Sequence, residues 1–495
     1  MEGRTESRAV TDTEGTRLGR AVAPLKAKHP GLTGIRTLGD GREAFAARTV
    51  LAREAERSID AQYYIWHGDV TGTLLFDELR AAAERGVRVR LLLDDNTTQG
   101  LDEMLAGLAA QPNIEVRLFN PFVHRSHRWI GYLTDFGRLN RRMHNKSFTV
   151  DNQATILGGR NIGDEYFGAG DSGLFVDLDV LAIGGVVSEV SRDFDRYWAS
   201  GSSYPAERVL PPLTAARAEE LAAAGQGVEA SAAAQRYMEA VRALPIVAQM
   251  ATAELALQWV EARLVSDDPA KGLGKAETGD LVISRLGRLL GHPKERLDLV
   301  SAYFVPTRTG VEHFAAMVGR GVRVNVVTNA LEATDVPLVH AGYAHRRRAL
   351  LRAGVRLWEM HGGAGDAARW KTTGRGGGGS TLRSSGTSLH AKTFVLDGER
   401  AFIGSFNFDP RSARLNTELG LVIADAEFAR GMEAGLAATI PRAAYEVQLS
   451  GDGQLRWIER GPGGEENSHS TEPGAGFWER AGVALLSVLP MEWLL

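Results

Sequence analysis

The stretch "RRMHNKSFTVDNQATILGGRN", residues 141–161, decides how this chain is interpreted. It sets His144 ahead of a lysine at offset two, an aspartate at seven, a glycine at fourteen and an asparagine at seventeen. The stretch "SLHAKTFVLDGERAFIGSFN", residues 388–407, repeats these offsets from His390. One such pattern could arise by chance, but two copies predict an internal duplication. The matched residues are Lys146, Asp151, Gly158 and Asn161 in the first copy and Lys392, Asp397, Gly404 and Asn407 in the second.

The repeat extends upstream of both histidines. "RGVRVRLLLDD" from Arg85 matches "RGVRVNVVTNA" from Arg320, and "SIDAQYYIW" from Ser58 loosely matches "RLDLVSAYF" from Arg296. These apolar segments predict strands, and "TGTLLFDELRAAAERG" between two of them has helical spacing and ends in glycine. Strand, helix, strand is a βαβ unit. We therefore predict two homologous α/β domains, with mixed, mainly parallel sheets flanked by helices.

The composition of the segments between the repeats predicts their boundaries. "TAARAEELAAA" and "TAELALQWVEARL", within residues 213–264, are both patterned as helices. The Gly- and Ser-rich residues 369–388 are interpreted either as a surface loop or as a lid over His390. We predict a tail over 1–39, domains over 40–205 and 276–445, a helical linker over 206–275 and a C-terminal extension over 446–495.

The overall composition is that of a folded protein, with 44% hydrophobic and 24% charged residues. A net charge of -4 argues against a nucleic-acid partner bound by bulk charge. The absence of cysteine excludes disulfides, thiol catalysis and Cys-ligated zinc. No run of roughly 18 apolar residues predicts a membrane-spanning helix. The charged N-terminus does not resemble a secretory leader, so we expect either no leader or one already removed.

The histidine–lysine spacing indicates phosphoryl chemistry. On a strand, His144 and Lys146 would share one face, as would His390 and Lys392. Imidazole can attack phosphorus or transfer a proton, and ammonium groups stabilise charge on the non-bridging oxygens. One histidine as nucleophile and the other as acid and then base gives a two-step phosphodiester exchange. Such a site would need no Mg²⁺, and we expect no metal and no cofactor.

Other residues are expected to support the histidines. Asp151 and Asp397 stand at turns and are interpreted as structural anchors. The strands that follow should return Asn161 and Asn407 beside the histidines of their own copies. Each histidine also needs an acid to fix its tautomer. The candidates are Asp177 and Glu418, on apolar strands 33 and 28 residues after the histidines of their own copies.

These paired motifs resemble those of the phospholipase D superfamily. The resemblance implies that the two domains pack as a pseudo-dimer with one shared active site. It also implies that His144 forms a phosphohistidine, while His390 protonates the leaving group and later deprotonates the acceptor. The first copy departs from the usual pattern, since "GGRN" has Gly159 where "GSFN" has Ser405. One hydroxyl donor is therefore missing from that half.

A closer resemblance covers the chain from about residue 40 to its end. "DAQYYIWHGDVTG", "LVSDDPAKG", "IGSFNFDPRSARLNTE" and "LPMEWLL" are similar to segments of the bacterial cardiolipin synthase C family. That resemblance implies transfer of a phosphatidyl group from phosphatidylethanolamine to phosphatidylglycerol, giving cardiolipin and ethanolamine. The alternatives are a phospholipase D that releases phosphatidic acid, a phosphodiesterase or nuclease of the superfamily, and a non-catalytic lipid-binding protein.

Two segments suggest a membrane surface as partner. Residues 124–146 hold six basic side chains against one acid, Asp135, with interleaved aromatics. The terminal "FWERAGVALLSVLPMEWLL" would either lie in the headgroup region or pack on the body. We expect a peripheral protein of the bacterial inner membrane, on the periplasmic side if a leader is missing from this chain. Whether it needs an accessory protein is not predicted by the sequence. Candidate substrate contacts are Arg141, Arg142, Tyr64 and Tyr303, whereas Asp94 and Asp95 are interpreted as cap and loop residues.

Overall fold

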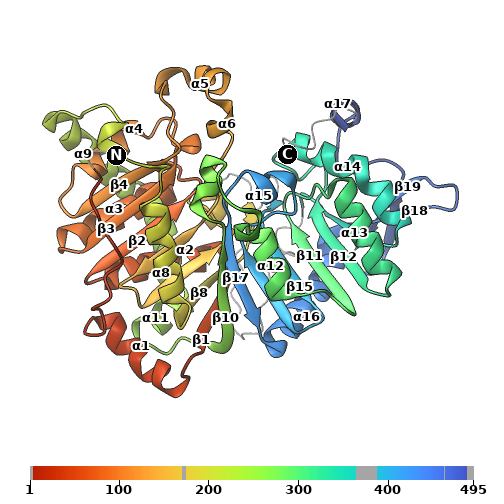
Figure 1. Ribbon diagram of the computed structural model, residues 1–495, viewed down its shortest axis with the longest axis horizontal. Coiled ribbons are helices and arrows are strands. Elements are labelled where there is room, and N and C mark those ends of the chain that lie inside the picture. Colours follow the sequence, from red (N-terminus) through yellow and green to blue (C-terminus); the bar gives the residue numbers. More distant parts are fainter. Residues whose placement is uncertain (1–3, 170–173, 364–386, 462, 488–495) are drawn as a thin grey trace. The chain divides into compact units, whose positions relative to one another are not determined.

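The computed structural model describes residues 4–169, 174–363, 387–461 and 463–487 (Figure 1). These residues form two compact units. Unit 1 comprises Met1–Gly170, Asp179–Ser284 and Leu415–Leu421, and unit 2 comprises Asp171–Leu178, Arg285–Arg414 and Val422–Leu495. Each half of the sequence therefore gives a short segment to the unit formed mainly by the other half.

Unit 1 is built on a mixed sheet. Its parallel part is the βαβ repeat, in which β2 pairs with β3 and β3 with β4. The other pairs are antiparallel, and one of them, β5 with β6, is a hairpin closed by a tight turn. In sheet order the strands are β9 (Ser203–Pro205), β4 (Ile114–Phe119), β3 (Arg88–Asp94), β2 (Ser58–Tyr63), β5 (Ser147–Val150), β6 (Ala154–Gly158), β8 (Asp179–Gly184), β1 (Thr33–Leu38) and β10 (Gln258–Ser266).

Helices cover both faces of this sheet. Tyr63 of β2 meets α2 (Gly41–Glu54), because its hydroxyl accepts a hydrogen bond from Arg48 Nε at 3.0 Å. Asp60, three residues earlier, instead bonds Arg90, whose guanidinium lies over Trp198 of α8 (Val187–Trp198). Residues three apart on a strand point to opposite faces. Helices α2 and α8 therefore lie on opposite faces, with α3 (Val70–Glu84) packed beside α2.

Unit 2 repeats this design. β11 pairs in parallel with β12, and β12 with β13, while the remaining pairs are antiparallel. Helices α13 (Thr307–Gly319), α14 (Pro337–Arg352) and α16 (Ala426–Ala443) pack against it. In sheet order the strands are β20 (Glu466–His469), β19 (Leu455–Arg460), β18 (Ala444–Leu449), β13 (Arg356–Met360), β12 (Arg323–Asn329), β11 (Arg296–Ser301), β15 (Lys392–Leu396) and β16 (Arg400–Gly404).

The α/β class with mixed sheets is confirmed, but the expectation of mainly parallel sheets is corrected. In the main sheet of each unit only the pairs among the three βαβ strands are parallel, and the other described pairs are antiparallel. A separate parallel pair in unit 2 joins β7 (Leu174–Val176) to β14 (Thr387–Leu389). The remaining elements are α1 (Arg17–Lys28), α4 (Asp102–Ala109), α5 (Arg128–Thr134), α6 (Phe136–Leu139), α7 (Asp164–Phe167), α9 (Ala215–Glu229), α10 (Ala232–Arg242), α11 (Pro245–Ala251), α12 (Val282–Leu290), α15 (Pro410–Arg414), β17 (Leu419–Ala424) and α17 (Phe477–Ser487).

Three segments outside the predicted domains take part in the units. Residues 1–39, predicted as a tail, supply β1 to the sheet of unit 1. The helical prediction for residues 252–264 was wrong, because α11 ends at Ala251 and residues 252–257 are not helical. From Gln258 the chain forms β10, which pairs with β1, and sheet pairing overrides the local helical pattern. The expected C-terminal extension supplies β18 to β20.

The C-terminal helix α17 packs on α14. Val483 and Ala475 are buried there with Leu331 and Ala341. The other side of α17 leaves Phe477, Trp478 and Leu485 exposed. Within the described residues, no helix is both long and apolar enough to cross a bilayer. The last residues, 488–495, and residues 369–386 of the segment interpreted as a surface loop or a lid lie outside the described residues.

Candidate functional site

The first half-site is formed around His144 in unit 1. His144 lies just ahead of β5 and is buried. Its Nδ1 lies 2.9 Å from Glu418 Oε2, and Lys146 Nζ donates to the His144 carbonyl at 2.6 Å. The ring of Tyr64 stands 5.0 Å from the imidazole and 5.7 Å from Lys146 Nζ. An imidazole, a carboxylate and an ammonium group are therefore held together in one unit.

Backbone pairing holds Glu418 against the histidine. His144 N donates to Thr417 O at 2.8 Å, and Thr417 N donates to Arg142 O at 2.9 Å. The Thr417 hydroxyl also donates to Asn145 Oδ1 at 2.9 Å. This bridge places segment 415–421 alongside the residues that carry His144.

A buried ion pair supports Glu418 from the other side. Asp267 Oδ2 accepts from Glu418 N at 2.8 Å and from Lys271 Nζ at 2.9 Å, while Asp267 Oδ1 accepts from Val282 N at 2.7 Å. Asp267 N in turn donates to Glu418 O at 3.0 Å. Burial raises the pKa of Asp267 to about 6, against the opposing charge of Lys271. Asp267 therefore fixes the backbone from which the Glu418 side chain reaches His144.

The second half-site is formed around His390 in unit 2. His390 Nδ1 lies 2.5 Å from Asp177 Oδ2, and Lys392 Nζ donates to the His390 carbonyl. Lys392 Nζ also lies 2.8 Å from His390 Nδ1. The parallel pair of β7 and β14 aligns these residues, with His390 N donating to Val176 O at 2.8 Å. The Phe175 ring lies 5.1 Å from the imidazole.

The acids are exchanged between the two copies. Glu418 and Asp177 are the expected acids, but each contacts the histidine of the other copy rather than its own. The expected pairing by sequence proximity is therefore corrected. The physical reason is that segments 171–178 and 415–421 belong to the units formed by the opposite halves. In both pairs the carboxylate meets Nδ1, which directs the chemistry of each ring to Nε2.

Asp151 and Asp397 are structural anchors, as predicted. Each sits at a turn with a positive φ of 50° or 54°. Asp151 accepts hydrogen bonds from the backbone N–H groups of residues 56, 57 and 58, at 2.8 to 3.0 Å. Asp397 accepts from residues 294, 295 and 296, at 2.8 to 2.9 Å. Both aspartates thus tie the hairpin after the motif to the start of the first βαβ strand.

The two asparagines make equivalent contacts in the two units. Asn161 Oδ1 accepts from Ile65 N at 3.1 Å, and Asn407 Oδ1 accepts from Tyr303 N at 3.2 Å. Asn161 Nδ2 also donates to Tyr166 OH at 3.0 Å. Both asparagines and Ser405 are buried. The side chains of Asn161 and Asn407 fix the loop that follows the first strand of each repeat. A catalytic role for these two asparagines remains a prediction.

The four candidate substrate contacts have different surroundings. Tyr64 is beside His144, whereas Tyr303 donates its hydroxyl to Asp335 Oδ2 at 2.7 Å. Arg141 Nη1 donates to Lys271 O at 3.3 Å. Arg142 is buried and bonds Asp94 Oδ1 at 3.2 Å, so it orders the segment before His144. Contact of these residues with substrate remains a prediction.

Asp94 and Asp95 are cap and loop residues, as predicted. Asp94 Oδ1 accepts from Asn96 N at 2.8 Å, and its Oδ2 accepts from Met143 N at 2.7 Å. Asp95 accepts from Phe122 N at 2.8 Å. Burial raises the pKa of Asp94 from its ordinary value, with Arg142 opposing the shift.

Sequence reasoning missed Asp267 and Lys271. Their segment, "SDDPAKG", was used only as part of the resemblance. The available signal was an acid at the end of an apolar strand, with a lysine four residues later. Partners 151 residues apart in sequence could not be inferred from that signal.

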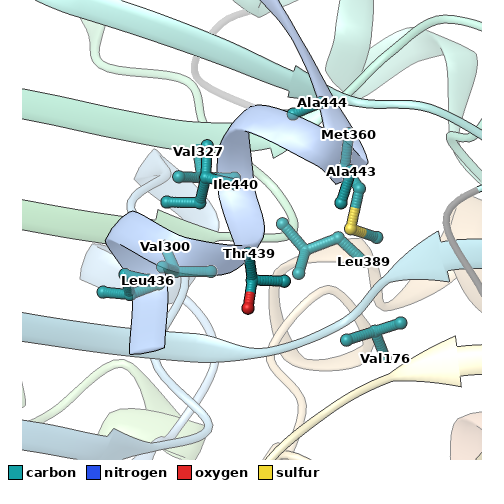
Figure 2. A pocket seen from close by; sticks show the side chains of 10 residues that line it. All are labelled: Val176, Val300, Val327, Met360, Leu389, Leu436, Thr439, Ile440, Ala443 and Ala444. Carbon is teal, nitrogen blue, oxygen red and sulfur yellow. The ribbon is translucent and has the colours of Figure 1, made fainter. Parts of the chain in front are cut away.

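An apolar hollow lies behind the second half-site in unit 2 (Figure 2). Leu389 and Val176, which precede His390 and Asp177, form part of its lining. Thr439 supplies the polar atom shown in Figure 2. Among the described residues, no charged side chain lines this hollow. Its lining is Val176, Val300, Val327, Met360, Leu389, Leu436, Thr439, Ile440, Ala443 and Ala444.

The two α/β units, each with a histidine in contact with a lysine and a carboxylate, agree with the resemblance to the phospholipase D class of protein. Comparison with known proteins is more specific. The family model described as "Cardiolipin synthase, PLD-like domain" matches residues 50–198 and 286–439, and the chain belongs to this family.

Individual relatives agree with this membership. The chain is 49% identical to cardiolipin synthase C of Escherichia coli (strain K12), over 97% of this chain and 100% of that protein. It is 26% identical to cardiolipin synthase A of Pseudomonas syringae pv. syringae (strain B728a), over 86% of this chain and 72% of that protein. The crystal structure of phosphatidylserine synthase from Haemophilus influenzae Rd KW20 matches at 16% identity with a TM-score of 0.56. That match covers 87% of this chain and 92% of that one, and it supports the fold alone.

Proposed function

We propose that this chain is a phosphatidyltransferase that makes cardiolipin from phosphatidylglycerol and a second phospholipid, phosphatidylethanolamine. The observation that carries the proposal is the pair of equivalent half-sites, each with a buried histidine bonded through Nδ1 to a carboxylate. The likeness to cardiolipin synthase C of E. coli along the whole chain supports the choice of lipid exchange over other phosphodiester reactions. We propose that both histidines act on one phosphorus atom.

In the first step, His144 Nε2 attacks the phosphorus of the donor lipid. The bond from phosphorus to the ethanolamine oxygen breaks, and His390 gives its Nε2 proton to that oxygen. Lys146 and Lys392 stabilise the negative charge on the non-bridging oxygens. Glu418 orients His144 and stabilises the positive charge that the ring gains on forming the phosphohistidine.

In the second step, the neutral His390 takes the proton of a glycerol hydroxyl of phosphatidylglycerol. The resulting oxygen attacks the phosphorus, and the bond to His144 Nε2 breaks. Asp177 orients His390 in both steps and stabilises its protonated form. The products are cardiolipin and ethanolamine.

Mass spectrometry of mixed phosphatidylethanolamine and phosphatidylglycerol vesicles tests the proposal. We expect cardiolipin and ethanolamine in equal amounts. Phosphatidic acid as the sole lipid product would replace the transferase with a hydrolase of the same site. His144→Ala and His390→Ala should each abolish turnover, and normal activity in either variant would remove that residue from the mechanism. We further propose a peripheral location on the bacterial inner membrane.

A further inference from the structure

Large apolar side chains are exposed near the first half-site, on a segment that we call the cap, residues 123–139. The cap comprises a short 3-10 turn (Arg125–His127), α5 and α6, and Figure 1 shows both helices beyond one end of the unit 1 strands. A surface rich in large apolar groups usually marks a binding site. The exposed fractions are 78% for Val123, 63% for Trp129, 37% for Tyr132, 77% for Leu133 and 44% for Phe136.

Three of these residues lie on one face of α5. Residues 129, 132 and 133 recur at the intervals with which a helix normally meets its own core, and Phe136 begins α6 after a break at Asp135. In the cap this face is exposed, while Gly131 and Leu139 are buried beside Phe122. The cap is therefore anchored by one side and offers the other for contact.

The charges of the cap are largely compensated inside unit 1. Arg125 bonds Asp95 Oδ2 at 2.7 Å and Asp102 Oδ2 at 2.8 Å, and Arg138 Nε bonds Asp135 Oδ2 at 2.6 Å. The three cap arginines, with Arg128 also beside Asp95, thus face three carboxylates. Within the cap, the excess of three arginines over Asp135 is offset by Asp95 and Asp102. Attraction of this surface to anionic lipid is consequently weak.

A chain of contacts joins the cap to the first half-site. The hydroxyl of Tyr132 donates to Asn96 Oδ1 at 2.7 Å, and Asn96 Nδ2 donates to Tyr64 OH at 3.2 Å. The Tyr64 ring then stands 5.0 Å from the ring of His144. Whatever covers the cap is therefore held close to the proposed nucleophile.

We propose that the cap inserts Trp129, Leu133 and Phe136 into the border between headgroups and hydrocarbon of a phospholipid bilayer. The inference rests on the proposed function, which supplies a phospholipid as the substrate. Aromatic side chains with a polar tip, such as those of Trp129 and Tyr132, suit this border. Because the arginines are paired internally, burial of apolar surface drives the insertion and salt has little influence on it.

Vesicle co-sedimentation with the full chain tests the proposal. Trp129→Ser with Leu133→Ser should lower the vesicle partition coefficient about tenfold or more, since two large apolar groups no longer leave water. Ile283→Ser with Leu289→Ser on α12 is the control, because it removes two large apolar side chains at 42% and 40% exposure outside the segments expected at the membrane. Unchanged binding of the cap variant would overturn the proposal and assign this face to a protein partner. An equal loss in both variants would also overturn it, by indicating general surface hydrophobicity.

Two further measurements separate this inference from the proposed function. Raising the salt from about 0.05 to about 0.5 M should change binding less than about twofold, and a loss above about tenfold would overturn apolar insertion. The cap variant should turn over a short-chain monomeric phospholipid at the wild-type rate while losing activity on vesicles. If the wild type makes no cardiolipin but the cap variant still loses vesicle binding, the proposed function fails and the insertion surface stands.

Discussion

The exchanged acids predict which chemical step each carboxylate supports. Glu418→Gln removes the charged partner of His144 Nδ1, whose contact of 2.9 Å is an ordinary charge-assisted hydrogen bond. Such bonds contribute about 1.5–3 kcal/mol, which corresponds to about 10- to 150-fold in rate. We therefore expect attack of His144 on the donor phosphorus to slow by about this factor. Asp177→Asn should instead impair proton transfer by His390.

A donor lipid that carries p-nitrophenol in place of ethanolamine separates the two effects. This leaving group needs no protonation, so formation of the phosphohistidine no longer depends on His390. Rapid mixing should then show a burst of p-nitrophenolate, equal to the enzyme concentration, with Asp177→Asn. The burst should be slowed by about 10- to 150-fold with Glu418→Gln.

The opposite assignment would refute the reasoning. A normal burst with Glu418→Gln and a slowed one with Asp177→Asn would mean that each acid serves the histidine of its own copy. Both variants must show the urea midpoint of the wild type, because buried carboxylates also affect stability. His390→Ala provides the reference for a site that can form the intermediate but cannot protonate ethanolamine.

Three further predictions concern stability. Asp267→Asn breaks a buried ion pair with Lys271 and should lower the free energy of unfolding in urea by about 3–5 kcal/mol; an unchanged midpoint would contradict the support assigned to Glu418. Asp397→Ala removes the acceptor of three backbone N–H groups and should cost about 1–2 kcal/mol by calorimetry; no loss would mean that water replaces the carboxylate. Desolvation raises the pKa of Glu472, but hydrogen bonds from His340 and Arg347 outweigh it and lower the pKa from 4.5 to about 2. Glu472→Gln should therefore lose roughly 3 kcal/mol above pH 4.5, a difference that shrinks as the pH falls towards 2. A difference independent of pH would contradict this assignment.

Local patterns were enough to predict the repeated core of the fold. The segment from Arg85 and its match from Arg320 became β3 and β12, and the helical spacing between the first strands became α3. The spacing of two in each motif predicted that the histidine and lysine share one face of a strand. In the structure His144 and Lys146 lie ahead of β5 and His390 lies ahead of β15. Each lysine is instead joined to its own histidine by a hydrogen bond to the backbone carbonyl. Strands, helices and the histidine–lysine contacts depend on residues close together in sequence, and such local relations can be predicted from the spacing of residue types.

Features that depend on distant partners were not predictable in this way. Glu418 contacts a histidine 274 residues away, and no offset within one motif reveals that pairing. The residues of β10 have a helical pattern, and only their register with β1 makes them a strand. Likewise, the charge of the cap could not be judged from its own residues, because Asp95 neutralises Arg125 from an earlier loop.

The two segments that join the opposite unit, 171–178 and 415–421, also determine when each site can be completed during translation. His144 leaves the ribosome long before Glu418, and at about 5–20 residues per second the interval is roughly 15–55 s. During that time the nascent first half has neither its acid nor the strand that holds it. The chain therefore matures late, and a truncated product that stops before residue 415 would carry an intact first motif without the carboxylate that contacts His144.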